Sequence, residues 1–193
     1  MPLNWSQEKY VKALKFATEA HCAVSQKVPG TEFPYICHPV MVTMEVLAAL
    51  SHHENVNGDL AVCCALLHDV IEDTKASYED VKDAFGKDIA DGVSALSKRE
   101  DAAASAKDEV SRKKLMMADS LARIKSQPKE VWMVKLSDRI TNLMAPPAYW
   151  SSEKRRKYRE EASTILAALG EASDFLARRL KQRIEKYGQY ISE

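Results

Sequence analysis

Residues 60–73, LAVCCALLHDVIED, constrain the fold of this chain most strongly. The stretch begins with an uninterrupted apolar run and contains no turn signal, so it predicts a fully buried helix rather than a strand. If the helix continues through Asp73, His68 and Glu72 lie four residues apart on one face, and Asp69 lies within one turn of both Glu72 and Asp73. Buried charges must pair with one another or bind a metal. We therefore hypothesise that this helix supplies metal ligands and acid or base groups.

Length and composition predict one all-α domain over residues 1–193, a helical bundle of roughly eight to ten helices. Only six glycines interrupt strong helix formers. A formal net charge of zero argues against polymeric nucleic acid as the main partner, although a local basic pocket could hold one nucleotide. No apolar run is long enough for a bilayer, and the first residues lack a secretory signal. We expect no membrane partner and a cytoplasmic monomer or homodimer with four reduced cysteines.

Two further segments carry candidate ligands. The loop at residues 26–39, QKVPGTEFPYICHP, contains three prolines and a glycine, and Pro39 suits the first turn of a new helix. His38 is therefore expected at that helix start. A second apolar helix, VWMVKLSDRITNLM, follows Pro128 and carries Asp138 in its middle, with Asn142 four residues later. Together these segments give a candidate metal set of His38, His68, Asp69 and Asp138.

Two imidazoles and two carboxylates form a mixed nitrogen and oxygen set that suits Mn²⁺, with Zn²⁺ or Fe²⁺ as alternatives. Such an ion activates water and polarises a phosphoryl group. Glu72 and Asp73 could then take a proton from the attacking water and orient it. The alternatives are a satisfied buried network, or a helix end that becomes exposed at His68.

The basic residues allow two interpretations. Lys27 lies in the proline-rich loop and could reach a ligand or be solvated. The basic run at residues 112–114, which includes Lys113, could hold phosphate or form a solvated helix face. A further helix, expected over residues 153–169, has a very basic first half that includes Lys154.

The order of the candidate ligands, H…HD…D, resembles that of the HD-domain metal-dependent phosphohydrolases. PYICHP, ALLHDVIEDT, a helix ending in FG, and VKLSDRITNL are similar to the hydrolase domain of the RelA/SpoT alarmone enzymes. The likeness is greatest to the stand-alone small alarmone hydrolases and extends over residues 17–187. An H-D pair alone is weakly specific, whereas HDxxED combined with PYxxHP and LSDRxxNL is strongly specific.

This resemblance implies hydrolysis of the 3′-pyrophosphate of (p)ppGpp to GDP or GTP and pyrophosphate, with Mn²⁺. It assigns metal binding to the four candidate ligands and the handling of water to Glu72 and Asp73. It implies substrate contacts for Lys27, Lys113, Asn142, Lys154 and Tyr158. Since the synthetase and regulatory domains of the long enzymes are absent, the chain is expected only to degrade the nucleotide.

One departure concerns the loop before the first motif. Alarmone hydrolases commonly have Arg-Lys there, whereas this chain has Gln26-Lys27 followed by PGTEF. An adenosine alarmone, (p)ppApp, is therefore an alternative substrate, as is another phosphorylated nucleotide such as NADPH. The alternative outside the enzymes is a nucleotide-binding module.

Overall fold

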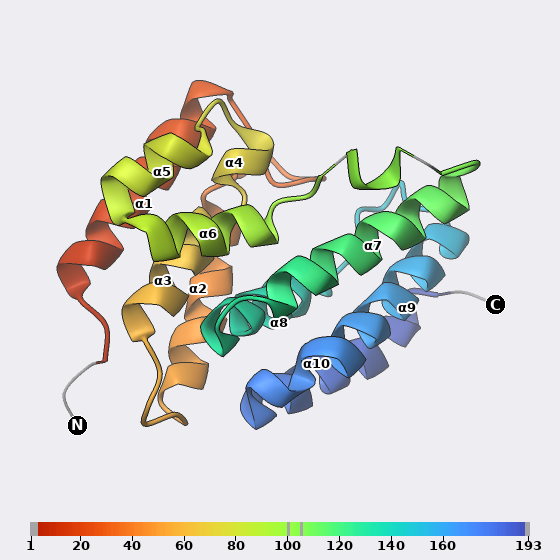
Figure 1. The fold of residues 1–193 in the computed structure, drawn as a ribbon. Coiled ribbons are helices and arrows are strands. Elements are labelled where there is room, and N and C mark those ends of the chain that lie inside the picture. Colours follow the sequence, from red (N-terminus) through yellow and green to blue (C-terminus); the bar gives the residue numbers. More distant parts are fainter. Residues whose placement is uncertain (1–3, 100, 105, 192–193) are drawn as a thin grey trace.

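The computed structural model describes residues 4–99, 101–104 and 106–191. Within these residues the fold is an all-α bundle without strands, as predicted (Figure 1). The helices are α1 (Gln7–Ala23), α2 (Cys37–Leu50), α3 (Gly58–Leu67), α4 (Val70–Asp73), α5 (Tyr78–Phe85), α6 (Lys87–Leu96), α7 (Glu109–Lys125), α8 (Lys129–Asn142), α9 (Ser152–Leu169) and α10 (Asp174–Tyr187). Short 3-10 turns cover Asp101–Ala103, Gly170–Ala172 and Gly188–Tyr190.

Several helix starts follow the local signals. Ser6 and Ser151 cap α1 and α9 through their side chains. Ser77 and Asp80 form a capping box at the start of α5. Side-chain caps satisfy backbone N–H groups that have no partner within the helix, so polar residues at these positions fix where each helix begins.

Helices α3 and α8 form the centre of the bundle. All of α3 except Asp59 is buried, which confirms the prediction of a buried apolar helix. It packs against α1, α2, α6 and α8. Helix α8 in turn packs against α2, α9 and α10. The buried helix α3 therefore meets α8 inside the molecule, where α8 buries Asp138 among its apolar residues.

The expectation that one helix runs through Asp73 is wrong. Helix α3 ends at Leu67, and α4 begins at Val70. Asp69 has φ −104° and ψ −2°, outside the usual helical values. The break changes the direction of the chain at the H-D pair, so the side chains of Glu72 and Asp73 are not aligned with His68 as one continuous helix face would align them.

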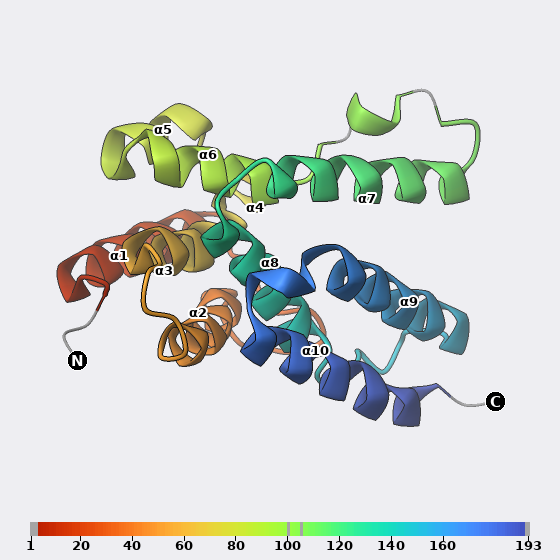
Figure 2. The same cartoon turned by 60° about the horizontal axis from the view of Figure 1, so that its bottom comes forward.

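Helices α7 and α9 extend beyond α8 on the same side of the molecule (Figure 2). Side chains from both helices line cavities between them. No described helix has both the length and the apolar character needed to cross a membrane. All four cysteines are free thiols, as expected.

Candidate active site

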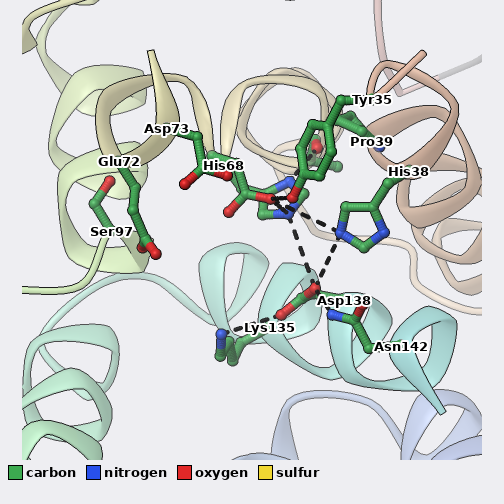
Figure 3. Close-up of polar contacts among 12 residues, drawn as sticks. Tyr35, His38, Pro39, His68, Glu72, Asp73, Ser97, Lys135, Asp138 and Asn142 are labelled. Atoms are coloured by element: carbon green, nitrogen blue, oxygen red, sulfur yellow. Dashed lines mark hydrogen bonds and ion pairs between the residues drawn. The ribbon is translucent and has the colours of Figure 1, made fainter. Parts of the chain in front are cut away.

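The four candidate metal ligands lie close together, and Figure 3 shows His38, His68 and Asp138 among them pointing toward one another. His38 comes from the first turn of α2, His68 and Asp69 from the turn between α3 and α4, and Asp138 from α8. His68 Nε2 lies 2.8 Å from Asp69 Oδ2, and His38 Nε2 lies 3.2 Å from Asp138 Oδ1. The crossed distances are 3.8 Å from His38 to Asp69 and 3.9 Å from His68 to Asp138. The ligand atoms of His38, His68 and Asp69 thus all lie within 4.8 Å of one another, and Asp138 approaches this group through its contacts with the two histidines.

The environment of His68 fits a bound cation. Its Nδ1 lies 2.9 Å from the carbonyl oxygen of Ala65, which fixes Nδ1 as the donor and directs Nε2 toward the carboxylates. Nε2 is buried and lies 2.8 Å from Asp69 Oδ2. A buried nitrogen lone pair that faces two carboxylates is favourable only when a proton or a metal ion lies between them. The donor set, two imidazoles and two carboxylates, suits a divalent ion.

The charges of the cluster also favour a cation. Burial alone would lower the pKa of His68, but the carboxylates of Asp69 and Asp138 raise it to about 9. Burial opposes ionisation of Asp69, yet the His68 imidazolium holds the pKa of that carboxyl below its usual range. Burial likewise opposes ionisation of Asp138, and Lys135 together with both histidines more than offsets it, so this pKa is also low. Both acids are therefore ionised at neutral pH.

The acidic pair lies beside the cluster, and each acid has its own partner. Glu72 accepts hydrogen bonds from both the backbone N–H and the ammonium group of Lys98, at 2.7 and 2.5 Å. Asp73 accepts one from Gln26 Nε2 at 2.9 Å. Burial raises the pKa of Asp73, and the Gln26 hydrogen bond opposes that rise. Asp73 is therefore more basic than an exposed aspartate. Glu72 is anchored to the segment after α6.

Tyr35 is a component of the site that sequence reasoning missed. Its hydroxyl donates to Asp69 Oδ2 at 2.5 Å, and its ring packs between His21 and His38. Burial and the charge of Asp69 raise the pKa of Tyr35, so the phenol stays protonated and holds the carboxylate in place. Its position in PYICHP, three residues before His38, is a sequence signal that could have identified it.

The candidate substrate residues lie in different places. Asn142 donates to Asp138 Oδ1 at the metal cluster. Lys113, Lys154 and Tyr158 line one cavity of about 300 Å³ between α7 and α9. Lys27 instead pairs with Glu32 inside its own loop. The structure therefore brings three of these five residues together, places a fourth at the metal cluster, and gives Lys27 a local partner.

Comparisons with known proteins agree with this arrangement. Residues 13–175 match the HD domain. The guanosine-3′,5′-bis(diphosphate) 3′-pyrophosphohydrolase MESH1 of Drosophila melanogaster is 30% identical over 159 residues, which cover 80% of this chain and 81% of that protein. The 3′-pyrophosphohydrolase of Aquifex aeolicus is 31% identical over 162 residues, or 84% of this chain. The match covers only 21% of the length of that longer relative.

A solved structure has a similar fold. The metazoan ortholog of SpoT that hydrolyses ppGpp and plays a role in starvation responses superposes with a TM-score of 0.74 at 26% identity. The superposition covers 95% of this chain and 98% of that one. The likeness in fold therefore extends over nearly the whole of both chains.

Proposed function

The chain belongs to the HD-domain family, and we propose that it hydrolyses the 3′-pyrophosphate of (p)ppGpp to GDP or GTP and pyrophosphate. The observation that carries the proposal is the convergence of His38, His68, Asp69 and Asp138 beside a basic cleft. Relatives that match most of this chain are named for the same reaction. Single-domain organisation, a cytoplasmic location and a monomeric or homodimeric state stay predictions.

These four residues would hold a divalent ion, which we propose to be Mn²⁺, with Zn²⁺ and Fe²⁺ as the other candidates. When bound, such an ion activates water and stabilises negative charge on a phosphoryl group. Tyr35 holds the Asp69 carboxylate through its hydroxyl, and Asn142 holds the Asp138 carboxylate through its amide. These hydrogen bonds fix the orientation of the two acids before substrate arrives.

The acidic pair handles the attacking water in this proposal. Asp73 accepts the proton, because burial makes its carboxylate more basic than an exposed aspartate. Glu72 orients the water, since its two hydrogen bonds to Lys98 hold its carboxylate in one position. Gln26 positions Asp73 from the other side. The residues that touch the nucleotide are proposed to be Tyr158, Lys113 and Lys154 in the cavity between α7 and α9, with Asn142 near the reacting phosphate.

The base preference has two candidates. The side chain of Gln26, which stands where alarmone hydrolases commonly have arginine, binds Asp73. Lys27 pairs with Glu32 in the same loop. Because both side chains have partners within the protein, the loop offers fewer groups for guanine, and (p)ppApp is the second candidate substrate.

The test is pyrophosphate release from ppGpp and ppApp, measured side by side on purified protein with and without Mn²⁺. We expect release that depends on the metal and falls to background in Asp69→Ala. The control is Lys12→Ala, which alters an exposed residue of α1 and should release pyrophosphate as the wild type does. No release from either nucleotide would contradict the proposal, and phosphate release from NADPH instead would redirect it to a different nucleotide. Wild-type turnover by Asp69→Ala would remove the metal assignment.

A further inference from the structure

Arg139 is a buried cation that is only partly paired: it forms an ion pair with Glu161, but two of its three nitrogens make no hydrogen bond. Its side chain is only 8% exposed, yet neither Nε nor Nη1 makes a hydrogen bond. The nearest acidic oxygen, Glu161 Oε2, lies 3.6 Å from Nη1, which is beyond hydrogen-bond distance. Buried charged donors are almost always satisfied in native proteins, since leaving them unmet is destabilising. Arg139 therefore needs an explanation.

Stacking accounts for only part of this arrangement. The guanidinium carbon lies 4.2 Å from the centre of the Tyr158 ring, so a cation–π contact holds the plane of the group. The N–H donors of a guanidinium lie in its plane and project from its edge, away from the stacked face. The ring thus orients Arg139 without using its donors, which stay available to a planar or tetrahedral oxyanion.

The surroundings of Arg139 are those of an anion site. Arg139 lines a cavity of about 330 Å³ between α7, α8 and α9. The other cationic side chains in its wall are Lys98, Arg112, Lys113 and Lys135. Two acids, Glu109 and Glu161, are also present. Five positive and two negative side chains therefore line the wall, although Lys98 also pairs with Glu72 and Lys135 with Asp138. A concave wall with excess positive charge concentrates anions.

This cavity begins at the candidate metal centre. Lys135 lines it and places its ammonium group 3.1 Å from Asp138 Oδ2. Lys98 also lines it and binds Glu72. In the view of Figure 3, Lys135 and Glu72 both lie on the side of the cluster away from His38. A phosphorus atom at the metal centre would therefore have a second, basic pocket next to it.

We propose that this cavity is the subsite for the distal phosphate of the substrate's diphosphate group, with Arg139 as its specificity-determining residue. The inference rests on the proposed function. In that reaction the water oxygen bonds to the phosphorus on O3′, the P–O3′ bond breaks, and O3′ takes a proton. The released diphosphate keeps the new oxygen. A monophosphate ester has no distal phosphate, so Arg139 favours diphosphate over monophosphate substrates and binds the product.

The direct test is binding of inorganic pyrophosphate to the manganese-loaded protein, followed by calorimetry, with inorganic phosphate as the comparison ligand. Losing charge-assisted hydrogen bonds to an anion typically weakens binding by roughly 10- to 100-fold. We expect Arg139→Met to weaken pyrophosphate binding by about that factor and to change phosphate binding by less than about threefold. Arg139→Lys keeps the charge but not the paired donors of the guanidinium, so its affinity for pyrophosphate should lie between those of the wild type and Arg139→Met.

The matched control is Arg156→Met, which alters an exposed arginine of α9 and should leave both affinities unchanged. Thermal unfolding of Arg139→Met should show a single cooperative transition, with a lower midpoint because the variant loses the ion pair with Glu161 and the cation–π contact with Tyr158. If that variant does not fold, Arg139→Lys carries the test. If Arg139 had only a structural role, Arg139→Met would lower stability but would change the affinities for pyrophosphate and phosphate by the same factor.

Activity provides an independent readout. The ratio of kcat/KM for ppGpp to that for a nucleoside 3′-monophosphate should fall by about tenfold or more in Arg139→Met. Pyrophosphate affinity that is unchanged in both Arg139 variants overturns the subsite, even if the protein hydrolyses ppGpp. Pyrophosphate binding that depends on Arg139 supports the subsite, even if ppGpp is not hydrolysed and the proposed function fails.

Discussion

Metal binding to the four-residue cluster is expected to depend on pH through His68. Without metal, the neighbouring carboxylates raise the pKa of His68 to about 9, so the ring carries a proton at neutral pH. A metal ion needs Nε2 without that proton. A pH of about 7 lies about two units below the pKa of His68, so removing the proton costs roughly 3 kcal/mol, or about 100-fold in apparent metal affinity.

The direction of the pH effect follows because the metal binds only the deprotonated form of His68. Raising the pH from about 7 to about 8 should tighten Mn²⁺ binding by about tenfold and release about one proton per ion. The carboxyl groups of Asp69 and Asp138 add no proton in this window, because their pKa values are lowered. The stabilisation that protonated His68 gives the metal-free protein is full below about pH 6.5 and is lost as the pH rises through about 9.

The assay is calorimetry in two buffers of different ionisation enthalpy, which counts released protons, with free Mn²⁺ followed by electron paramagnetic resonance. The control is His53→Gln, since His53 lies outside the cluster and bonds to Ser173. That variant should release the same number of protons as the wild type. Binding that is independent of pH and releases no proton would refute the geometry assigned to His68.

Three substitutions test other parts of the structure. Tyr35→Phe removes the hydroxyl that holds Asp69, and should weaken Mn²⁺ binding by roughly 10- to 100-fold in a competition titration; an unchanged affinity would contradict that role. Gly92→Ala places a Cβ 2.7 Å from the sulfur of Cys64, so the free energy of unfolding measured in urea should fall by about 1–3 kcal/mol. An unchanged free energy of unfolding would mean that α6 packs less closely than described. Ser77→Ala removes the cap of α5 and should cost about 1 kcal/mol by the same method, with an m-value equal to wild type.

The sequence alone determined the helices and their local pairings. The apolar run before His68 specified a buried helix, and serine caps marked where helices begin. The spacing of Asp138 and Asn142 placed both on one face of α8, where they form a hydrogen bond. These features depend on residues within one or two turns of each other, so the periodicity of the chain is enough to predict them.

Only the tertiary structure decided which side chains surround the site. Glu72 and Lys98 are separated by 26 positions, and Asp73 and Gln26 by 47, and no local pattern links them. The break at Asp69 likewise turns the H-D pair toward α2 and α8 and separates it from the acids that follow. Arg139 has an ordinary sequence context, and its unmet donors exist because α7, α8 and α9 enclose it. Such contacts depend on the angles at which distant helices cross, and those angles are set by packing of the whole core rather than by neighbouring residues.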